Sequence, residues 1–188
     1  MTKVLVAYAT RAGSTREVAN RVADRVDAAG ICVDVRPADA VTDLDSYDGV
    51  VLGSALYTGR LHPAARRFLR RHRTRLAELP FAIFAMGPRT LDDDDVAGAR
   101  TQLEAGLRKV PELHPMLDGI FGGVVDPARL RFPLNRLPAS DARDWTAIEE
   151  WADLAAALLR TDLPAFGARN VVDTPHADAG VDRHAAVG

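Results

Sequence analysis

The sequence predicts an α/β fold, a doubly wound parallel sheet of five strands with helices on both faces. Three observations support this fold class. Short apolar runs of strand length alternate along the chain with segments whose apolar residues recur at helical spacing. The run 48–54 is apolar along its length, as expected of a strand that helices cover on both sides. With 188 residues, 47% of them hydrophobic, the chain can bury the core of one such domain.

The strand and helix patterns follow one another in a regular order. The predicted strands cover residues 4–9, 31–35, 48–54, 81–86 and 119–125. The predicted helices lie between Thr15 and Gly30, over 63–76, over 96–109, and after Asp144, which caps the last one. Beyond Arg160 no apolar period is sustained. We therefore expect one domain over 1–160 and a poorly structured tail over 161–188.

The first strand breaks into a loop that is rich in hydroxyl groups. A strand that feeds a tight turn into a helix N-terminus forms an anion site, because the first helical N–H groups lack intrahelical partners and the helix dipole is positive there. Thr10, Ser14 and Thr15 add hydroxyl donors, and Gly13 allows the backbone to approach a phosphate closely. The alternative is a capped turn that binds nothing. The predicted phosphate-binding residues are Thr10, Arg11, Ala12, Gly13, Ser14 and Thr15.

The spacing of residues within this loop narrows the choice of phosphate-bearing ligand. A dinucleotide fingerprint needs G-x-G-x-x-G, and a nucleoside triphosphate loop ends in Gly-Lys-Ser/Thr; the loop has one glycine and no lysine. Hydroxyls around a single glycine suit one terminal phosphate that neutral donors hold. The spacing T-x-x-G-x-T resembles the loop of the flavodoxin family, and the resemblance implies flavin mononucleotide (FMN) as cofactor and a sheet order of 2-1-3-4-5.

Two further loops leave the carboxyl ends of predicted strands, where ligands of doubly wound sheets bind. In the loop after the third strand, an aromatic side chain beside small residues can lie against a flat flavin ring. In the loop after the fourth strand, Arg89 either favours a reduced flavin anion or pairs with the acidic run 92–95. The predicted ring-binding residues are Ser54, Ala55, Leu56, Tyr57, Thr58, Gly59, Met86, Gly87, Pro88, Arg89 and Thr90.

Composition argues against several classes of protein. A formal net charge of −2 gives no general attraction to nucleic acid, and no apolar run approaches the ~20 residues that span a bilayer. The sequence begins directly with a strand, so we expect no signal peptide and a cytoplasmic protein. The lone cysteine, Cys32, lies in a predicted strand, and we expect it to be buried and inert. The acidic run 92–95 fits a helix cap better than a metal site, and we predict no metal.

Within the flavodoxin-like proteins, the sequence resembles the menaquinone-dependent protoporphyrinogen dehydrogenases. The matching stretches are ATRAGSTREVA, residues 9–19, and YDGVVLGSALYTGRLHPAARRFLRRHRTRL, residues 47–76. Gly122-Gly123 and Asp144-Trp145 also match. The resemblance implies an FMN-dependent oxidoreductase of the protoporphyrinogen or quinone type, whose partner is a quinone or another redox partner. Segment 126–139 is shorter than in that branch, although Arg129, Arg131, Phe132 and Arg136 keep its arginine and aromatic character.

The helix that begins at Pro63 has a basic face. This face is either solvated or docks on an anionic membrane surface or an acidic redox partner. Membrane docking would make the protein peripheral to the inner membrane face. The residues expected at such a contact are Arg66, Arg67, Arg70 and Arg71.

Two other function classes share the predicted fold. An electron-carrier flavodoxin has no small-molecule substrate, but such carriers tend to be strongly acidic, and this chain is nearly neutral. A signalling receiver needs acidic residues after the first strand and a lysine after the fifth; this chain has Ala9-Thr10 at the first place and no lysine at the second. The oxidoreductase is therefore the preferred hypothesis, with the electron carrier as its alternative.

Overall fold

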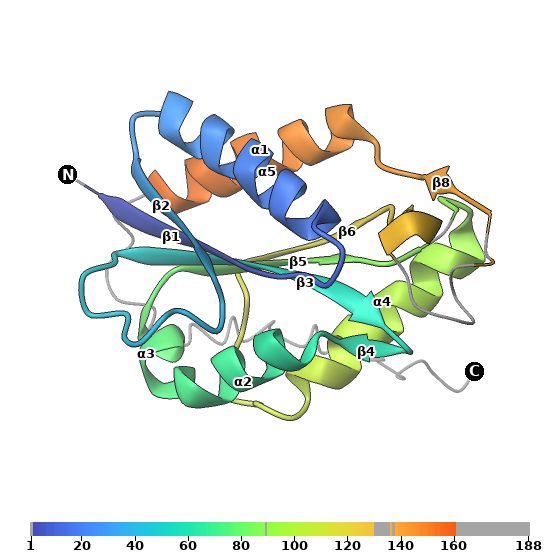
Figure 1. The fold of residues 1–188 in the computed structure, drawn as a ribbon. Coiled ribbons are helices and arrows are strands. Elements are labelled where there is room, and N and C mark those ends of the chain that lie inside the picture. The colour runs from blue at the N-terminus through green and yellow to red at the C-terminus, as the bar shows by residue number, and fades with distance from the viewer. Residues whose placement is uncertain (1, 89, 130–135, 137, 161–188) are drawn as a thin grey trace, which may run out of the picture.

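The structure is a computed structural model, and it describes residues 2–88, 90–129, 136 and 138–160. Its main sheet holds five parallel strands in the order β2-β1-β3-β5-β6, which confirms the predicted fold class and strand order (Figure 1). These strands are β1 (Lys3–Ala9), β2 (Cys32–Pro37), β3 (Gly49–Tyr57), β5 (Phe81–Met86) and β6 (Leu117–Phe121). The predicted tail, 161–188, lies outside the described residues.

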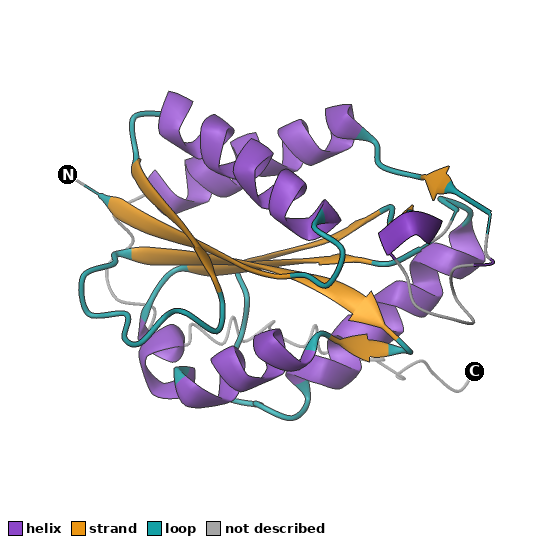
Figure 2. Ribbon diagram, viewed as in Figure 1, coloured by secondary structure: helices purple, strands orange, loops and turns teal. Residues whose placement is uncertain are grey.

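Helices cover both faces of the sheet (Figure 2). Alternate residues of the strands face opposite layers, so that Leu5 and Val6 belong to different apolar clusters, and both are fully buried. One layer is formed by α1 (Ser14–Ala28) and α5 (Trp145–Arg160), and the other by α2 (Pro63–Arg71), α3 (Arg73–Glu78) and α4 (Asp93–Leu107).

The strand register aligns the ends that carry the predicted loops. Ala9 at the end of β1 pairs with Ser54 of β3, and Ser54 pairs in turn with Ala85 of β5. Because these strands are parallel, the loops after β1, β3 and β5 all leave the sheet at the carboxyl ends of its strands. The strand order reverses between β1 and β3, and ligands of doubly wound sheets bind at such a point. The sheet thus brings the predicted phosphate loop and both predicted ring loops to the same edge.

Two predicted helices have different bounds in the structure. The predicted helix 63–76 is two helices, α2 and α3, which meet at His72. His72 has a φ of −103° and packs its ring against Phe68, with 4.9 Å between the ring centroids. Helix α4 begins at Asp93 rather than residue 96, because the side chain of Asp92 accepts the backbone N–H of Asp95 at 2.9 Å and caps the helix.

The prediction for Cys32 is wrong. Its thiol is exposed, because Cys32 is the first residue of β2 and β2 is the edge strand of the sheet. An outermost strand has no neighbouring strand on one side, so a side chain in it can be exposed even where the sequence pattern is that of a buried strand.

Two short features were not predicted. Strand β4 (Arg60–Leu61) folds back on β3 as a hairpin, and strands β7 (Val124–Val125) and β8 (Ser140–Asp141) form a separate antiparallel ribbon. The predicted strand 119–125 is therefore β6 followed by β7. Gly122 lies between them, and a Cβ at this position would be 1.9 Å from the carbonyl oxygen of Ala142. Only glycine allows the chain after β8 to pass so close to the end of β6.

None of the described helices is both long and apolar enough to cross a membrane. Of segment 126–139, the structure describes residues 126–129, 136, 138 and 139, including a short 3₁₀ helix over Pro127–Arg129. The arginine-bearing stretch around Arg131 and Phe132 lies outside the described residues.

Candidate functional site at the carboxyl edge of the sheet

The loop after β1 is a tight turn that opens helix α1. Gly13 adopts a left-handed conformation, with φ at 97°, which a residue with a Cβ rarely adopts. The backbone N–H of Gly13 donates to Oγ1 of Thr10 at 3.0 Å and closes the turn. The glycine and the first threonine of the predicted motif therefore shape the loop.

The N-terminus of α1 is free of a side-chain cap. Its first intrahelical bond runs from the N–H of Glu17 to the carbonyl of Gly13 at 3.2 Å, so the N–H groups of the preceding turn have no acceptor within the helix. Thr15 is fully buried, and its Oγ1 has no hydrogen-bond partner among the described residues. A buried hydroxyl without a partner destabilises the fold unless a ligand supplies one. A phosphate at the helix N-terminus would supply it, so the residues present fit a phosphate-bearing cofactor.

The phosphate loop contacts the predicted ring loop after β3. The guanidinium carbon of Arg11 lies 4.8 Å from the centroid of the Tyr57 ring, a cation–π contact between the two segments. Tyr57 is half-buried at the end of β3, and Arg11 is exposed. The contact places an aromatic face beside the loop that would bind phosphate.

The loop after β3 turns back as a hairpin. Thr58 and Gly59 both have positive φ, at 48° and 75°, and they connect β3 to β4. Ser54 is fully buried, and its Oγ accepts the N–H of His62 at 3.1 Å and donates to the carbonyl of Ala55 at 3.0 Å. The hydroxyl of Ser54 thus holds the base of the hairpin, while Leu56 to Gly59 lie nearer its tip.

The loop after β5 is anchored at several points. The N–H of Gly87 donates to the carbonyl of Phe121 at 3.2 Å, and the N–H of Gly123 donates to the carbonyl of Pro88 at 2.8 Å. These bonds tie the loop to the end of β6. Met86 and Pro88 are buried.

Thr90 is engaged by the acidic start of α4. Its Oγ1 bonds to the carboxylate of Asp92 and, at 2.8 Å, to that of Asp95. The bond from Thr90 lowers the pKa of Asp92. Arg89, which was predicted to lie beside the flavin or to pair with this acidic run, lies outside the described residues.

The two ring loops meet and share a hollow. A Cβ on Gly87 would lie 2.7 Å from the Cβ of Leu56, so glycine is required for this contact. A hollow of about 310 Å³ lies between the loops and α4. Its lining includes Leu56, Thr58, Gly59, Gly87 and Pro88. This size falls within the range of small-molecule sites.

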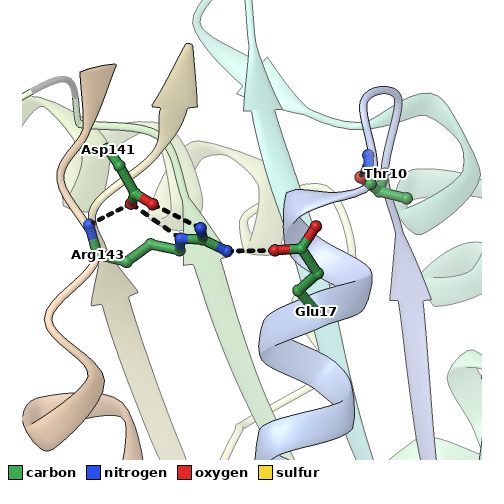
Figure 3. Close-up of polar contacts among 5 residues, drawn as sticks. Thr10, Glu17, Asp141 and Arg143 are labelled. Carbon is green, nitrogen blue, oxygen red and sulfur yellow. Dashed lines mark hydrogen bonds and ion pairs between the residues drawn. The ribbon is translucent and has the colours of Figure 1, made fainter. Parts of the chain in front are cut away.

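An ion-pair cluster beside the phosphate loop was not predicted; the side chain of Arg143 is 11% exposed, and those of Glu17 and Asp141 are about half exposed. Arg143 donates to both carboxylate oxygens of Asp141, at 2.9 and 2.5 Å, and to the carboxylate of Glu17 at 2.6 Å (Figure 3). Glu17 belongs to the first turn of α1. Asp144-Trp145, next to Arg143, is one of the stretches that resemble the protoporphyrinogen dehydrogenases, but nothing in the sequence connects it to Glu17.

The predicted site residues that the structure describes thus lie at the carboxyl ends of β1, β3 and β5 and in the segments that follow them. Part of the predicted loop after the third strand belongs to β3, which extends to Tyr57, and Ser14 and Thr15 open α1. The Arg11–Tyr57 and Leu56–Gly87 contacts join these loops into one region. Within the described residues, no group of three or more His, Cys, Asp and Glu side chains could hold a metal ion.

Known proteins share this fold. The structure is similar to a flavodoxin from the domain Archaea, with a TM-score of 0.56 and 12% identity over 84% of this chain and 99% of that one. It is also similar to oxidised flavodoxin 2 from Bacillus cereus, with a TM-score of 0.54 and 22% identity over 84% and 97% of the two chains. At these identities the similarity shows the fold.

A curated relative is closer in sequence. The chain is 34% identical over 86 residues to protoporphyrinogen IX dehydrogenase (quinone) from Escherichia coli strain K12, a match that covers 45% of this chain. The chain spans about half the length of this relative, 48%. The family model described as "Flavodoxin domain" matches residues 5–136, which include all three loops. The chain therefore belongs to the flavodoxin-domain family, and this membership supports FMN as its cofactor.

Proposed function

We propose that the protein is an FMN-dependent oxidoreductase of the protoporphyrinogen or quinone type. The observation that carries the flavin part of the proposal is the uncapped N-terminus of α1, with the buried, unpartnered hydroxyl of Thr15 behind the turn at Gly13. A single phosphate fits this turn. Neither a second glycine nor a lysine is present for a dinucleotide or a triphosphate.

Different residues of the site would bind the phosphate and the ring of FMN. Thr10 to Thr15 would hold the phosphate, and Tyr57 with the loop after β5 would border the ring. FMN, when bound, supplies the electron-transfer chemistry, and the protein supplies position and electrostatics. The loop after β5 would be a rigid wall beside the ring, because the N–H groups of Gly87 and Gly123 form hydrogen bonds between this loop and the end of β6.

The substrate class rests on the resemblance to protoporphyrinogen IX dehydrogenase. The 86 matched residues are 34% identical, which supports a redox enzyme of this kind. Segment 126–139 begins directly after β7, and its first residue, Asp126, lines a hollow with Ala12 and Ser14. Arginines of this segment could attract the carboxylates of a porphyrin.

The alternative is an electron-carrier flavodoxin. The solved structures that resemble this fold include several flavodoxins, which favours this second candidate. The net charge of −2 does not match a strongly acidic carrier. Turnover separates the two candidates: an enzyme would oxidise protoporphyrinogen with a quinone as acceptor, whereas a carrier would accept electrons from a reductase and show no such turnover.

A quinone acceptor would bring the protein to a membrane, and α2 offers a basic face for that contact. Arg67, Arg70 and Arg71 are exposed, have no ion-pair partner among the described residues, and line a hollow of about 390 Å³. Arg66 is half-buried, which makes it the least available of the four predicted contact residues. We propose that the protein works in the cytoplasm and contacts the inner membrane face through this helix.

The proposal is tested by assaying the FMN-loaded protein with protoporphyrinogen as electron donor and a neutral quinone as acceptor in one reaction, and in a second reaction with dithionite as the donor and the same quinone as acceptor. Oxidation of protoporphyrinogen coupled to quinone reduction is the expected result. Quinone reduction with dithionite as the electron donor, but none with protoporphyrinogen, would restrict the function to a quinone reductase. Absence of both activities would favour the electron carrier.

A further inference from the structure

Arg143 forms ion pairs with two carboxylates, those of Asp141 and Glu17, whose side chains are about half exposed. Its side chain is only 11% exposed, and it makes the three bonds to Asp141 and Glu17 described above. Its guanidinium also lies 4.8 Å from the ring centroid of Trp145. The pKa of Arg143 is raised and that of Asp141 lowered, in each case chiefly by the hydrogen bonds between the two side chains. The guanidinium is therefore a fixed charge in one orientation.

Glu17 is placed where a negative charge matters to the phosphate loop. It lies in the first turn of α1 and lines a hollow of about 180 Å³ together with Ala12, Ser14 and Arg143. Figure 3 shows Glu17 between Arg143 and the turn that carries Thr10. A carboxylate in the first turn stabilises the helix dipole, but it repels a phosphate dianion bound at the same N-terminus. Asp126 lines the same hollow and adds a second carboxylate.

We propose that Arg143 is a specificity-determining residue, which pairs with Glu17 so that the loop accepts a flavin that carries a phosphate. Asp141 fixes the guanidinium, and the guanidinium both offsets the charge of Glu17 and draws its carboxylate toward the β7–β8 ribbon. Arg143 acts through Glu17 and need not contact the cofactor itself. This inference rests on the proposed binding of FMN and adds a residue outside the loop to the recognition of the phosphate.

Two variants distinguish an electrostatic role of Arg143 from a structural one. In Arg143→Gln, Glu17 would keep its charge beside the phosphate without a partner, and FMN affinity should fall about tenfold, while riboflavin affinity stays the same because riboflavin has no phosphate. In the double variant Arg143→Gln with Glu17→Gln, the repulsion is gone and most of the FMN affinity should return. A loss of fold would lower the affinity for both flavins, and Glu17→Gln would not restore it.

The test uses the full chain without flavin, titrated with FMN and with riboflavin. Glu17→Gln alone should bind FMN more tightly than wild type and riboflavin equally well, and this variant does not depend on how Arg143→Gln folds. The FMN deficit of Arg143→Gln should shrink as salt is raised, because salt screens the repulsion. The melting temperature without flavin reports the structural contribution of each variant.

The outcomes separate this inference from the proposed function. Wild type that binds FMN and riboflavin equally overturns both. If wild type prefers FMN and Arg143→Gln keeps the full preference, the role proposed for Arg143 is overturned and the proposed function is not. Failure of Glu17→Gln to restore FMN affinity in the double variant also overturns it.

Discussion

The guanidinium of Arg11 lies over the ring of Tyr57, 4.8 Å from its centroid, and joins the phosphate loop to the predicted ring loop. Since Arg11 is exposed and Tyr57 is half-buried, the contact borders solvent and should add less than about 1 kcal/mol to stability. The contact matters more for where it places the ring of Tyr57 than for its energy. One side of Tyr57 is covered by the residue that follows Thr10, so the aromatic face and the phosphate loop form one continuous border.

The first prediction concerns Tyr57. Tyr57→Ala should weaken the binding of FMN and riboflavin by the same factor, about tenfold, because a ring contact does not sense the phosphate. Tyr57→Phe should bind both flavins as wild type does. Fluorescence titration with each flavin measures the effect. A loss of affinity for FMN alone would mean that Tyr57 acts through the phosphate loop.

The second prediction concerns the unpartnered hydroxyl of Thr15. Thr15→Val keeps the shape of the side chain and removes a buried hydroxyl that has no partner within the part of the chain that the structure describes, so the protein without flavin should be as stable as wild type or more stable. FMN affinity should fall by about 1.5–3 kcal/mol, the value of a hydrogen bond to a charged group. Riboflavin affinity should not change.

A matched control is Thr101→Val. The hydroxyl of Thr101 donates to the carbonyl of Ala97 within α4 and is exposed. This variant should bind FMN as wild type does. If Thr15→Val also keeps wild-type FMN affinity, the hydroxyl does not contact the phosphate.

The third prediction concerns pH. His72 is 8% exposed, and burial lowers its pKa below the ordinary value of 6.5. The nearby Arg71 also lowers this pKa, while Asp43 and the backbone at Val41 raise it. As the pH falls below about 6.5, the unfolded chain binds a proton at His72 that the folded chain excludes. The free energy of unfolding should therefore fall with pH in this window, by at most about 1.4 kcal/mol per pH unit for this group.

Urea denaturation at pH 7.5 and pH 5.5 measures this effect. His72→Gln should lose less stability between the two pH values than wild type does. His114→Gln, which changes an exposed histidine, should lose as much as wild type. His62 has a pKa that burial also lowers, so His72→Gln should retain part of the pH dependence. An unchanged pH dependence in His72→Gln would show that His72 does not titrate in this window.

The fourth prediction concerns the basic face of α2. Removing the charge of Arg67, Arg70 and Arg71 should weaken binding to vesicles that contain an anionic lipid by about a hundredfold, at ~1 kcal/mol for each arginine. Vesicle sedimentation with and without anionic lipid is the measurement. Arg73 and Arg75 already pair with Glu112 and Glu78, so Arg73→Gln with Arg75→Gln should bind nearly as wild type does. Equal binding of wild type to neutral and anionic vesicles would rule out this contact.

The sequence predicted the sheet and the meeting of the three loops at its carboxyl end because both follow from local patterns. Apolar strands alternating with amphipathic helices require a parallel sheet, and parallel strands place their following loops at one edge. The spacing of Thr10, Gly13 and Thr15 predicts a phosphate loop from local sequence alone, and phosphate binding at these residues stays a prediction.

Features that depend on distant contacts could not be predicted in this way. Arg143 and Glu17 are 126 residues apart in the sequence. They meet because Arg143 lies between β8 and α5, and α5 packs against α1, with ion pairs Arg21–Glu149 and Arg25–Asp153. Cys32 has the local context of any strand residue, and its exposure depends on the place of β2 at the edge. The break between α2 and α3 has no glycine or proline to signal it, and it occurs where His72 packs against Phe68.

The central claim is that the turn between β1 and α1 recognises the phosphate of FMN. Titrating the flavin-free wild-type protein with FMN and with riboflavin tests this claim most directly, since the two ligands share the ring and differ in the phosphate. We expect FMN to bind about a hundredfold or more tightly than riboflavin, as several charge-assisted hydrogen bonds at the helix N-terminus would provide. Equal affinities would contradict the claim.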